Sequence, residues 1–353
     1  MQEQLFGGTV LVAGGAGFIG SNFIRRMHRR HPGARIVNFD KLTYAGNTEN
    51  LADIAKDPRY VFVRGDIADR GAVERVLAKH HPDYIINFAA ESHVDRSIHG
   101  DAEEFMRTNV HGVFVLLEIM RRRSTVKKFV QVSTDEVYGD LPLDATNQKF
   151  SEESILRPNS PYASSKAAGD LLCRAYFRTF GVPVVVTRCG NNYGPYQYPE
   201  KLIPYFILRV MDGKKVPLYG DGAHVRDWVH VEDHCAALER CLLAGKPGEM
   251  YNIGAGNERS NKAIARFILK HFGADESQIE FVADRPGHDR RYALDAAKIG
   301  EELGWASETD FEAGLADTIL WYRAHQDWMR SAWSRIDAPN PHIPVPPPLP
   351  AIL

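Results

Sequence analysis

The feature that most constrains the fold is the succession of a strand, a glycine-rich turn and a helix near the start of the chain. Residues 9–13 form an apolar run typical of a buried strand, and Gly14, Gly17 and Gly20 follow it before the amphipathic run 21–28. In parallel α/β sheets, this arrangement presents a helix N-terminus to an anion and lets a pyrophosphate approach the backbone. The spacing is Gly-x-x-Gly-x-x-Gly rather than Gly-x-Gly-x-x-Gly. We therefore expect a dinucleotide-binding turn, with a purely structural glycine turn as the alternative.

An acidic residue stands where a dinucleotide-binding fold needs one. The second predicted strand, 35–39, is followed by Asp40, which lies twenty residues beyond Gly20. A carboxylate at this distance binds the ribose hydroxyls of adenosine and repels a 2′-phosphate. The sequence thus favours NAD over NADP, although the neighbouring Lys41 weakens that preference.

Strand and helix patterns alternate along the first half of the chain. Further strands are predicted at 60–63, 83–88, 129–132 and 184–188, and long helices at about 102–123 and 161–180. This alternation predicts an α/β fold with a Rossmann-like doubly wound parallel sheet and a smaller α/β substrate-binding domain. The expected divisions are 1–188 for the cofactor domain (rejoined by about 228–255), 189–335 mainly for the substrate, and 336–353 as a proline-rich tail.

The polar stretch Ser133 to Gly139 follows directly on a buried-strand pattern. In open parallel sheets, ligands bind at the carboxyl ends of the strands. Asp135 and Glu136 stand side by side there, and two carboxylates can divide acid and base duties when their surroundings separate their pKa values. Both reach one ligand only if the backbone turns after Thr134, because successive residues of an extended strand face opposite ways. The alternative is a solvated turn or a helix start, since Thr and Asp cap helices well.

Tyr162 and Lys166 form a second candidate catalytic pair. Ser160 and Pro161 predict a helix start, so these two residues, four apart, share one face of the helix. An ammonium beside a phenol stabilises the phenolate, lowers the tyrosine pKa and makes Tyr162 a usable base near neutral pH. The spacing alone is common by chance, and it becomes a sharper indication behind a dinucleotide-binding turn.

Composition narrows the class of protein. The 353 residues carry a formal net charge of -2, which argues against nucleic acid or an anionic membrane as the main partner. The four cysteines include no Cys-x-x-Cys pair, and no stretch approaches the length of a membrane span, so a cytoplasmic protein is expected. His230 and His234 have metal-ligand spacing, but no third ligand is evident, and no metal site is expected.

With these motifs in place, the chain resembles the extended short-chain dehydrogenase/reductases, and within them the dTDP-glucose 4,6-dehydratases, from about residue 9 to 322. Beside the motifs above, the resemblance is carried by Asp40 to Asn47, Ala89 to Ser97, Asn191 to Pro195 and Asp284 to His288. Ala13, Gly190 and His224 depart from the Thr, Ser and Asn that are usual in the family. The tail lies outside the family pattern.

The resemblance implies roles for the site residues. Tyr162, held basic by Lys166, would take the proton of the sugar 4-hydroxyl, and Thr134 would hydrogen-bond that oxygen. Glu136 would take the carbon-5 proton, and Asp135, kept protonated, would donate to the departing 6-hydroxyl. NAD would contact Gly14, Gly17, Phe18, Ile19, Gly20, Asp40, Lys41, Leu42, Thr43, Asp66, Ile67, Phe88, Ala89, Ala90, Ser92, Thr108, Tyr162, Lys166 and Asn192. The nucleotide-diphosphate sugar would contact Ser92, Thr134, Asn191, Lys201, Leu202, Pro217, Tyr219, Arg226, Asn261, Asp284, Arg285 and His288.

The resemblance also implies a homodimer built through the two long helices, and a product that is a 4-keto-6-deoxy sugar plus water. Three alternatives stay open: a UDP-sugar 4,6-dehydratase, a 4-epimerase or decarboxylase on the same scaffold, and an NAD-binding sensor without catalysis. The epimerases and decarboxylases do not, as a rule, carry the full Thr134-Asp135-Glu136 triad. Thymidine and uridine differ by one methyl group, which is worth only about 1–3 kcal/mol in a pocket.

The tail gives a first testable prediction. Seven of the seventeen residues from Asp337 to Leu353 are proline, so this segment is expected to be extended and outside any core. Apolar residues interleave with the prolines, which favours docking in a surface groove of its own or a partner subunit over a disordered tail. Truncation after Arg335 should leave turnover largely intact while lowering the melting temperature or loosening the dimer. Unchanged melting and unchanged dimer mass would favour the disordered alternative.

Overall fold

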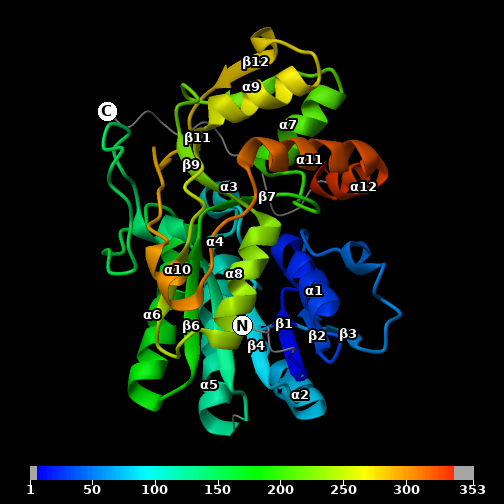
Figure 1. Ribbon diagram of the computed structural model, residues 1–353, viewed down its shortest axis with the longest axis vertical. Coiled ribbons are helices and arrows are strands. Elements are labelled where there is room, and N and C mark those ends of the chain that lie inside the picture. The colour runs from blue at the N-terminus through cyan, green and yellow to red at the C-terminus, as the bar shows by residue number, and fades with distance from the viewer. Residues whose placement is uncertain (1–5, 124, 338–353) are drawn as a thin grey trace.

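A seven-stranded parallel sheet is the centre of the computed structural model, which describes residues 6–123 and 125–337 (Figure 1). The strands are ordered β10-β6-β5-β4-β1-β2-β3. They are β1 (Thr9–Ala13), β2 (Arg35–Asp40), β3 (Tyr60–Arg64), β4 (Tyr84–Asn87), β5 (Lys128–Thr134), β6 (Val184–Cys189) and β10 (Met250–Ile253). The order reverses direction between β1 and β4, which confirms the doubly wound, Rossmann-like sheet predicted from the sequence. Of the tail predicted at 336–353, residues 336 and 337 are not extended but end helix α12 (Gln326–Asp337), and the remainder lies outside the described residues.

Alternate strand residues pack against two helical layers, as the period of two in a strand requires. Val10 and Val12 belong to the core on one face, and Leu11 and Ala13 belong to the core on the other. The first face is covered by α1 (Phe18–Arg30), α8 (Val231–Ala244) and α10 (Ala297–Leu303). The second face is covered by α2 (Arg70–His80), α5 (Val113–Arg123) and α6 (Pro161–Phe180). Both faces are buried, which is why the strands are continuous apolar runs rather than alternating ones.

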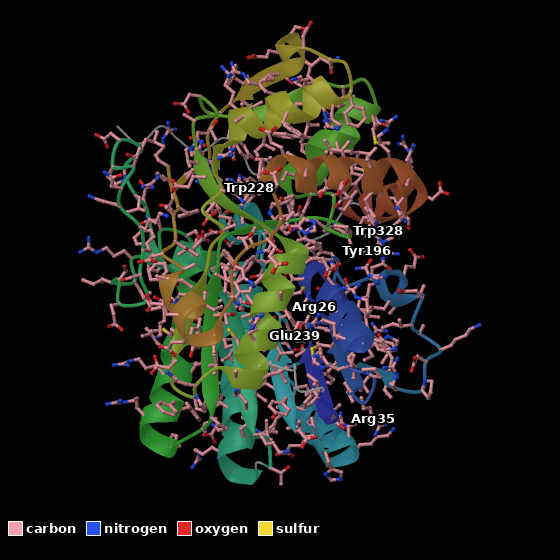
Figure 2. The ribbon with its side chains drawn as sticks, in the orientation of Figure 1. Arg26, Arg35, Tyr196, Trp228, Glu239 and Trp328 are labelled. Atoms are coloured by element: carbon pink, nitrogen blue, oxygen red, sulfur yellow. The ribbon has the colours of Figure 1, made fainter. Side chains whose placement is uncertain are left out.

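A buried carboxylate of α8 helps to fix this helix to α1 and to the residue that follows it. Glu239 accepts hydrogen bonds from Arg26 Nε at 2.5 Å and from His31 Nε2 at 2.9 Å, and Arg26 and Glu239 are labelled in Figure 2. The glutamate side chain is only 7% exposed, so its charge is compensated by these partners rather than by water. This contact joins residues 213 positions apart in the chain.

A smaller α/β part follows the large sheet and lies at the top of Figure 1. Its strands are β7 (Asn191–Tyr193), β8 (Val216–Tyr219), β9 (Val225–His230), β11 (Glu258–Ser260) and β12 (Ile279–Val282). Its helices are α7 (Leu202–Met211), α9 (Asn261–His271), α11 (Phe311–Ala324) and α12 (Gln326–Asp337). Buried residues such as Ile203, Trp228 and Leu315 form a third core there, and Trp228 is labelled in Figure 2. Residues 191–193 form a short strand because β9, distant in sequence, supplies their backbone partners.

The first of the two long predicted helices is helical but not uniform. Helix α4 (Ala102–Phe105) leads into a π-helical segment, Met106–Gly112, and then into α5. Such widened turns are rare and occur frequently at functional sites. This one carries Thr108, which lines the large cavity described below, and Asn109, which is buried. The hydrophobic pattern alone did not predict this irregularity.

Two further observations concern the expected surroundings of the protein. Within the part of the chain that the structure describes, no helix is long and apolar enough to cross a membrane. The four cysteines, Cys173, Cys189, Cys235 and Cys241, are all buried and unpaired.

The glycine turn generates a prediction about stability. A methyl group at Gly20 would overlap the Gly14 carbonyl oxygen and lie 2.8 Å from Gly15 Cα, whereas at Gly17 its nearest neighbour would be 3.4 Å away. Overpacking against rigid backbone costs about 1–3 kcal/mol. Gly20→Ala should therefore lower the melting temperature by several degrees, and Gly17→Ala should melt close to the wild type. Equal melting of the two variants would show that the close packing at Gly20 is dispensable.

Candidate active site

A cavity of about 310 Å³ lies at the carboxyl ends of the parallel strands. Residues from the glycine turn, from the ends of β2, β4 and β5, and from α6 line it. The cavity gathers eighteen of the residues expected to hold NAD: Gly14, Gly17, Phe18, Ile19, Gly20, Asp40, Lys41, Thr43, Asp66, Ile67, Phe88, Ala89, Ala90, Ser92, Thr108, Tyr162, Lys166 and Asn192. Leu42 does not line the cavity.

The glycine turn has the open backbone that a pyrophosphate requires. Gly14 has a φ of 75°, which only glycine adopts freely, and a side chain there would collide with Ala89. Gly17 is the N-cap of α1, and no side chain caps this helix. The first backbone N–H groups of α1 therefore remain available to an anion in the cavity. The residues present fit a dinucleotide.

Asp40 has a structural task in addition to the expected contact with ribose. Its Oδ2 accepts a hydrogen bond from Ala16 N at 2.9 Å, and its Oδ1 accepts one from Leu42 N at 2.7 Å. Burial raises the pKa of this carboxyl, and the two backbone hydrogen bonds oppose that rise. Lys41 lies 3.2 Å from Asp66, so its charge is partly compensated. Lys41 therefore attracts a 2′-phosphate less than the sequence indicated, and the preference for NAD that Asp40 confers is stronger.

The same turn is supported from the far end of the chain. Ala16 O accepts a hydrogen bond from Asn50 Nδ2 at 3.0 Å, and Trp328 Nε1 of α12 donates to Asn50 Oδ1 at 2.9 Å. Trp328 also packs edge-on against Tyr196, and both are labelled in Figure 2. The position of the glycine turn therefore depends on α12. Neither Asn50 nor Trp328 stands out in the sequence.

The chain turns immediately after β5, as the expected use of both carboxylates requires. Residues Asp135–Tyr138 form a 3₁₀ turn, and Thr134 Oγ1 accepts a hydrogen bond from Glu136 N at 3.3 Å. The Thr134 hydroxyl also donates to Asp135 Oδ1 at 3.2 Å. Thr134, Asp135 and Glu136 all line the cavity together with Tyr162 and Lys166. The turn predicted at this point is confirmed.

The surroundings give the two carboxyl groups, Asp135 and Glu136, different pKa values. Burial raises the pKa of Asp135 well above its usual range, and the charge of Glu136 raises it further. Burial also raises the pKa of Glu136, but Arg285, Arg226 and Lys201 lower it. Asp135 is therefore the group that keeps its proton, and Glu136 is the group that ionises more readily.

The tyrosine–lysine pair differs from the sequence-based expectation. Lys166 Nζ donates to Val132 O at 2.7 Å, and burial lowers the pKa of the ammonium. Burial raises the pKa of Tyr162 well above its usual value, and the carboxylate of Glu136 raises it further. The expected lowering of the Tyr162 pKa is thus wrong for the protein alone, because burial and the charge of Glu136 raise it.

The residues expected to hold the nucleotide sugar divide into two groups. Ser92, Thr134, Asn191 and Lys201 line the cavity. Leu202, Pro217, Tyr219, Arg226, Asn261, Asp284, Arg285 and His288 do not line it and lie in the smaller part or its loops. Two members of this second group meet at Asp95, which accepts hydrogen bonds from Tyr219 Oη at 3.3 Å and Arg285 Nη1 at 3.1 Å. Because Arg226 and Arg285 act on the pKa of Glu136, this group adjoins the catalytic turn.

A contact across the cavity was missed in the sequence. Tyr44 Oη donates to Glu200 Oε1 at 3.0 Å, and the Arg96 guanidinium lies 3.6 Å from the centre of the Tyr44 ring. Glu200 lines the cavity, so this contact links the segment after β2 to the segment before α7. Further lining residues that were not predicted are Phe39, Ala45, Gly46, Gly65, Glu91, Val132, Ser133, Cys189, Gly190, Gln197 and Tyr198. No spacing or pattern in the sequence indicates that these side chains converge.

The histidine pair with metal-ligand spacing does not converge on one point. His230 caps α8 by accepting from Glu232 N at 3.4 Å, and His234 Nδ1 lies 2.8 Å from Asn192 Oδ1. Asp233, which lies between them, accepts hydrogen bonds from Ser307 Oγ at 2.7 Å and Thr309 N at 2.9 Å. These side chains have structural partners.

The doubly wound sheet, the uncapped glycine turn and the Tyr162–Lys166 pair define a dinucleotide-binding protein of the extended short-chain dehydrogenase/reductase class. A family model described as GDP-mannose 4,6 dehydratase matches residues 11–318. The dTDP-glucose 4,6-dehydratase of Streptomyces niveus is 52% identical over 335 residues, which cover 94% of this chain and 96% of that protein. The dTDP-glucose 4,6-dehydratase 1 of Escherichia coli K12 is 48% identical, with 91% and 94% covered. The chain belongs to the dTDP-glucose 4,6-dehydratase family.

Solved structures agree with this assignment. DesIV, a dTDP-glucose 4,6-dehydratase from Streptomyces venezuelae crystallised with NAD, has a TM-score of 0.88 and 49% identity, covering 92% of this chain and 99% of DesIV. The UDP-glucose 4-epimerase of Thermus thermophilus has a TM-score of 0.81 but only 31% identity, covering 89% of this chain and 99% of the epimerase. The shared scaffold therefore extends to epimerases, and the higher identity is with dehydratases.

The raised pKa of Asp135 generates a prediction about stability against pH. A carboxyl whose pKa is higher in the folded than in the unfolded state loses stabilising effect as pH rises above the unfolded value. Asp135→Asn removes this cost, so the variant should melt a few degrees above the wild type at about pH 8 and level with it at about pH 4. Melting curves across this range measure the difference.

The exposed Asp144 offers a matched control, because Asp144→Asn makes the same chemical change without burial. It should melt like the wild type at both pH values. A gain for Asp135→Asn that did not grow with pH would contradict the assignment of a raised pKa.

Proposed function

We propose that this protein converts dTDP-glucose to dTDP-4-keto-6-deoxyglucose and water, by oxidation at carbon 4, elimination across carbons 5 and 6, and return of the hydride to carbon 6. The observation that carries the proposal is the turn at the end of β5. It places Asp135 and Glu136 beside Tyr162 in one cavity, in surroundings that separate their pKa values. Oxidation at carbon 4 alone needs no second acid, whereas loss of the 6-hydroxyl does.

The cofactor in this proposal is NAD. When bound, it accepts a hydride from carbon 4 and returns one to carbon 6, and the positive charge of its ring lowers the pKa of any phenol beside it. The glycine turn and the first turn of α1 would hold the pyrophosphate, and Asp40 would hold the adenosine ribose. The match to relatives that contain NAD supports this choice.

For the oxidation, we assign the base to Tyr162. Its hydroxyl takes the proton from the sugar 4-hydroxyl, and Thr134 hydrogen-bonds the same oxygen. The high pKa of Tyr162 in the protein alone keeps the phenol protonated until the cofactor charge is present. Lys166, buried beside it, holds the ionised form once it is produced.

For the elimination, we assign the base to Glu136 and the acid to Asp135. A ketone at carbon 4 acidifies the proton on carbon 5, which brings it within reach of a carboxylate. Arg285 and Arg226 favour the ionised form of Glu136 that this step needs. Asp135, kept protonated by burial, donates to the departing 6-hydroxyl, which leaves as water.

We also propose that different parts of the chain bind the cofactor and the nucleotide sugar, and that the protein forms a homodimer. Residues 1–188 with about 228–255 would hold NAD, and 189–335 would mainly hold the nucleotide sugar, with Lys201, Arg226 and Arg285 as cations for its diphosphate. Leu171 and Phe180 of α6 are 56% and 49% exposed, which supports a dimer through this helix and α5. The mass measurement in the truncation experiment on the tail also tests the dimer.

Purified protein should convert dTDP-glucose to a product lighter by one water without added reductant, because the hydride is recycled. Mass analysis of the product measures this outcome. A product of unchanged mass with inverted carbon 4 would make the protein an epimerase, and faster turnover of UDP-glucose would make it a UDP-sugar dehydratase.

Single variants separate the two half-reactions. Asp135→Asn and Glu136→Gln should each lose about 10²–10⁴-fold in dehydration, while some carbon-4 oxidation persists as reduced cofactor on the enzyme. Tyr162→Phe should lose both steps, because it removes the first base. Glu153→Gln, at an exposed site, is the matched control and should keep the wild-type rate. Wild-type turnover by Asp135→Asn would refute the acid assignment.

A further inference from the structure

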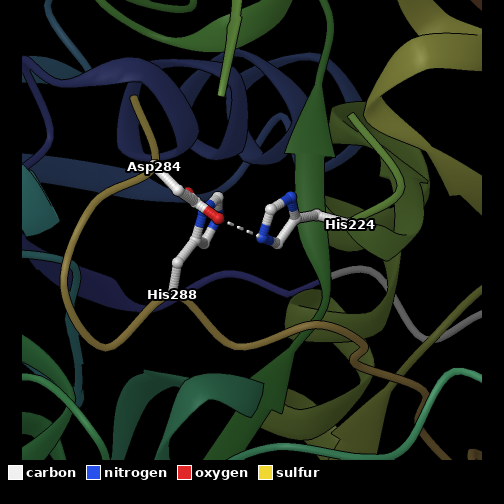
Figure 3. A group of neighbouring side chains, drawn as sticks. All are labelled: His224, Asp284 and His288. Atoms are coloured by element: carbon white, nitrogen blue, oxygen red, sulfur yellow. Dashed lines mark hydrogen bonds and ion pairs between the residues drawn. The ribbon is translucent and has the colours of Figure 1, made fainter. Parts of the chain in front are cut away.

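His224, Asp284 and His288 form a compact cluster outside the large cavity (Figure 3). His224 directly precedes β9, and the other two lie on the loop after β12. Asp284 Oδ2 lies 3.1 Å from His224 Nε2, and Asp284 Oδ1 lies 2.6 Å from His288 Nδ1. One donor atom from each side chain lies within 4.8 Å of the other two. Within residues 6–123 and 125–337, this is the one group of His, Cys, Asp or Glu side chains that approaches the geometry of a metal site.

The donor spacing suits an ion, whereas the ring orientation must change. The two imidazole rings stack with centres 3.7 Å apart and planes 14° apart, so a ring must tilt before both can direct a nitrogen at one ion. A tetrahedral zinc ion with bonds of about 2.0–2.1 Å spaces its donor atoms about 3.3 Å apart, which is close to the 3.1 Å contact of Asp284 with His224 and longer than its 2.6 Å contact with His288. His224 Nδ1 has no hydrogen-bond partner, so the ring proton can move there and free Nε2 without breaking a bond. The Asp284 side chain is 35% exposed, which leaves an entry path and an open ligand position.

Three arginines lie around the cluster. Each has a partner that reduces the electrostatic repulsion between its guanidinium and a bound cation. Arg290 lies 3.4 Å from His224 Nε2 but pairs with Asp221 at 2.8 Å. Arg285 pairs with Asp95 at 3.1 Å. Arg226 Nη2 donates to Asp289 O at 2.9 Å, and this guanidinium lies 4.3 Å from the centre of the Tyr292 ring.

We propose that His224, Asp284 and His288 bind a divalent transition-metal cation of the zinc class. Two nitrogen donors and one carboxylate suit Zn²⁺ or Co²⁺, whereas Mg²⁺ takes mainly oxygen ligands. Asp284 and His288 are also expected to contact the nucleotide sugar, so the cation and the nucleotide exclude each other. This second half of the inference rests on the proposed function, and the cation binding itself does not.

Cobalt is the probe for binding, because tetrahedral Co²⁺ absorbs visible light when it occupies a zinc-type site. The full-length protein, freed of metal by chelation, is titrated with CoCl₂, and Zn²⁺ is then added to displace the cobalt. One equivalent should bind, and dTDP should weaken that binding. His224→Asn should weaken it at least about tenfold, as should Asp284→Asn on the more exposed loop. His271→Asn, on the surface of α9, is the control and should bind like the wild type.

Each outcome decides one half of the inference. Unchanged affinity in both His224→Asn and Asp284→Asn, or no stoichiometric binding to the wild type, would overturn the metal site. Cobalt bound equally well with and without dTDP would keep the metal site and overturn the competition. Turnover plays no part in these measurements, so a failure of the proposed dehydratase activity would be seen separately.

Discussion

The parallel pairing of β1 with both β2 and β4 is the constraint on which the site depends. Ala13 stands opposite Phe39 on one side and opposite Asn87 on the other, so three strands end at one level. The pairing of β5 with β6 continues that edge as far as Thr134. The glycine turn, Asp40 and the turn after Thr134 thus surround one cavity, although about 120 residues separate the first from the last. The backbone hydrogen bonds between the strands therefore set the positions of the side chains that follow each strand.

Local patterns predicted the elements that short-range physics controls. The first strand matches the predicted 9–13, and helix α6 matches the predicted 161–180 with Ser160 as its cap and Pro161 at its first position. These two predictions are correct because apolar runs, caps and proline act within a few residues. The turn after Thr134 was predicted from a functional requirement, and the structure contains it. The roles of the residues in that turn remain predictions.

The features that sequence reasoning missed depend on contacts between distant segments. The π-helical segment before α5, the contact between Tyr44 and Glu200, and the support of Asn50 by Trp328 have no local pattern. The predicted direction of the Tyr162 pKa shift was wrong for a related reason. Residue spacing identifies the nearest charge but does not show how deeply the side chain is buried. Desolvation is set by the whole fold, and in this cavity it exceeds the effect of a single neighbouring lysine.

The joining of α8 to α1 has a consequence for how the protein is made. Ribosomal synthesis delivers the first helix and its strand long before residue Glu239, which compensates Arg26 from 213 positions away. Until then, α1 and β1 bury apolar residues against each other, but the part of this core that α8 supplies is missing, and the support of the glycine turn by Trp328 emerges later still. The N-terminal half therefore reaches its final packing only after α8 and α12 have been made. Apolar surface that is covered late is open to aggregation while the chain is incomplete.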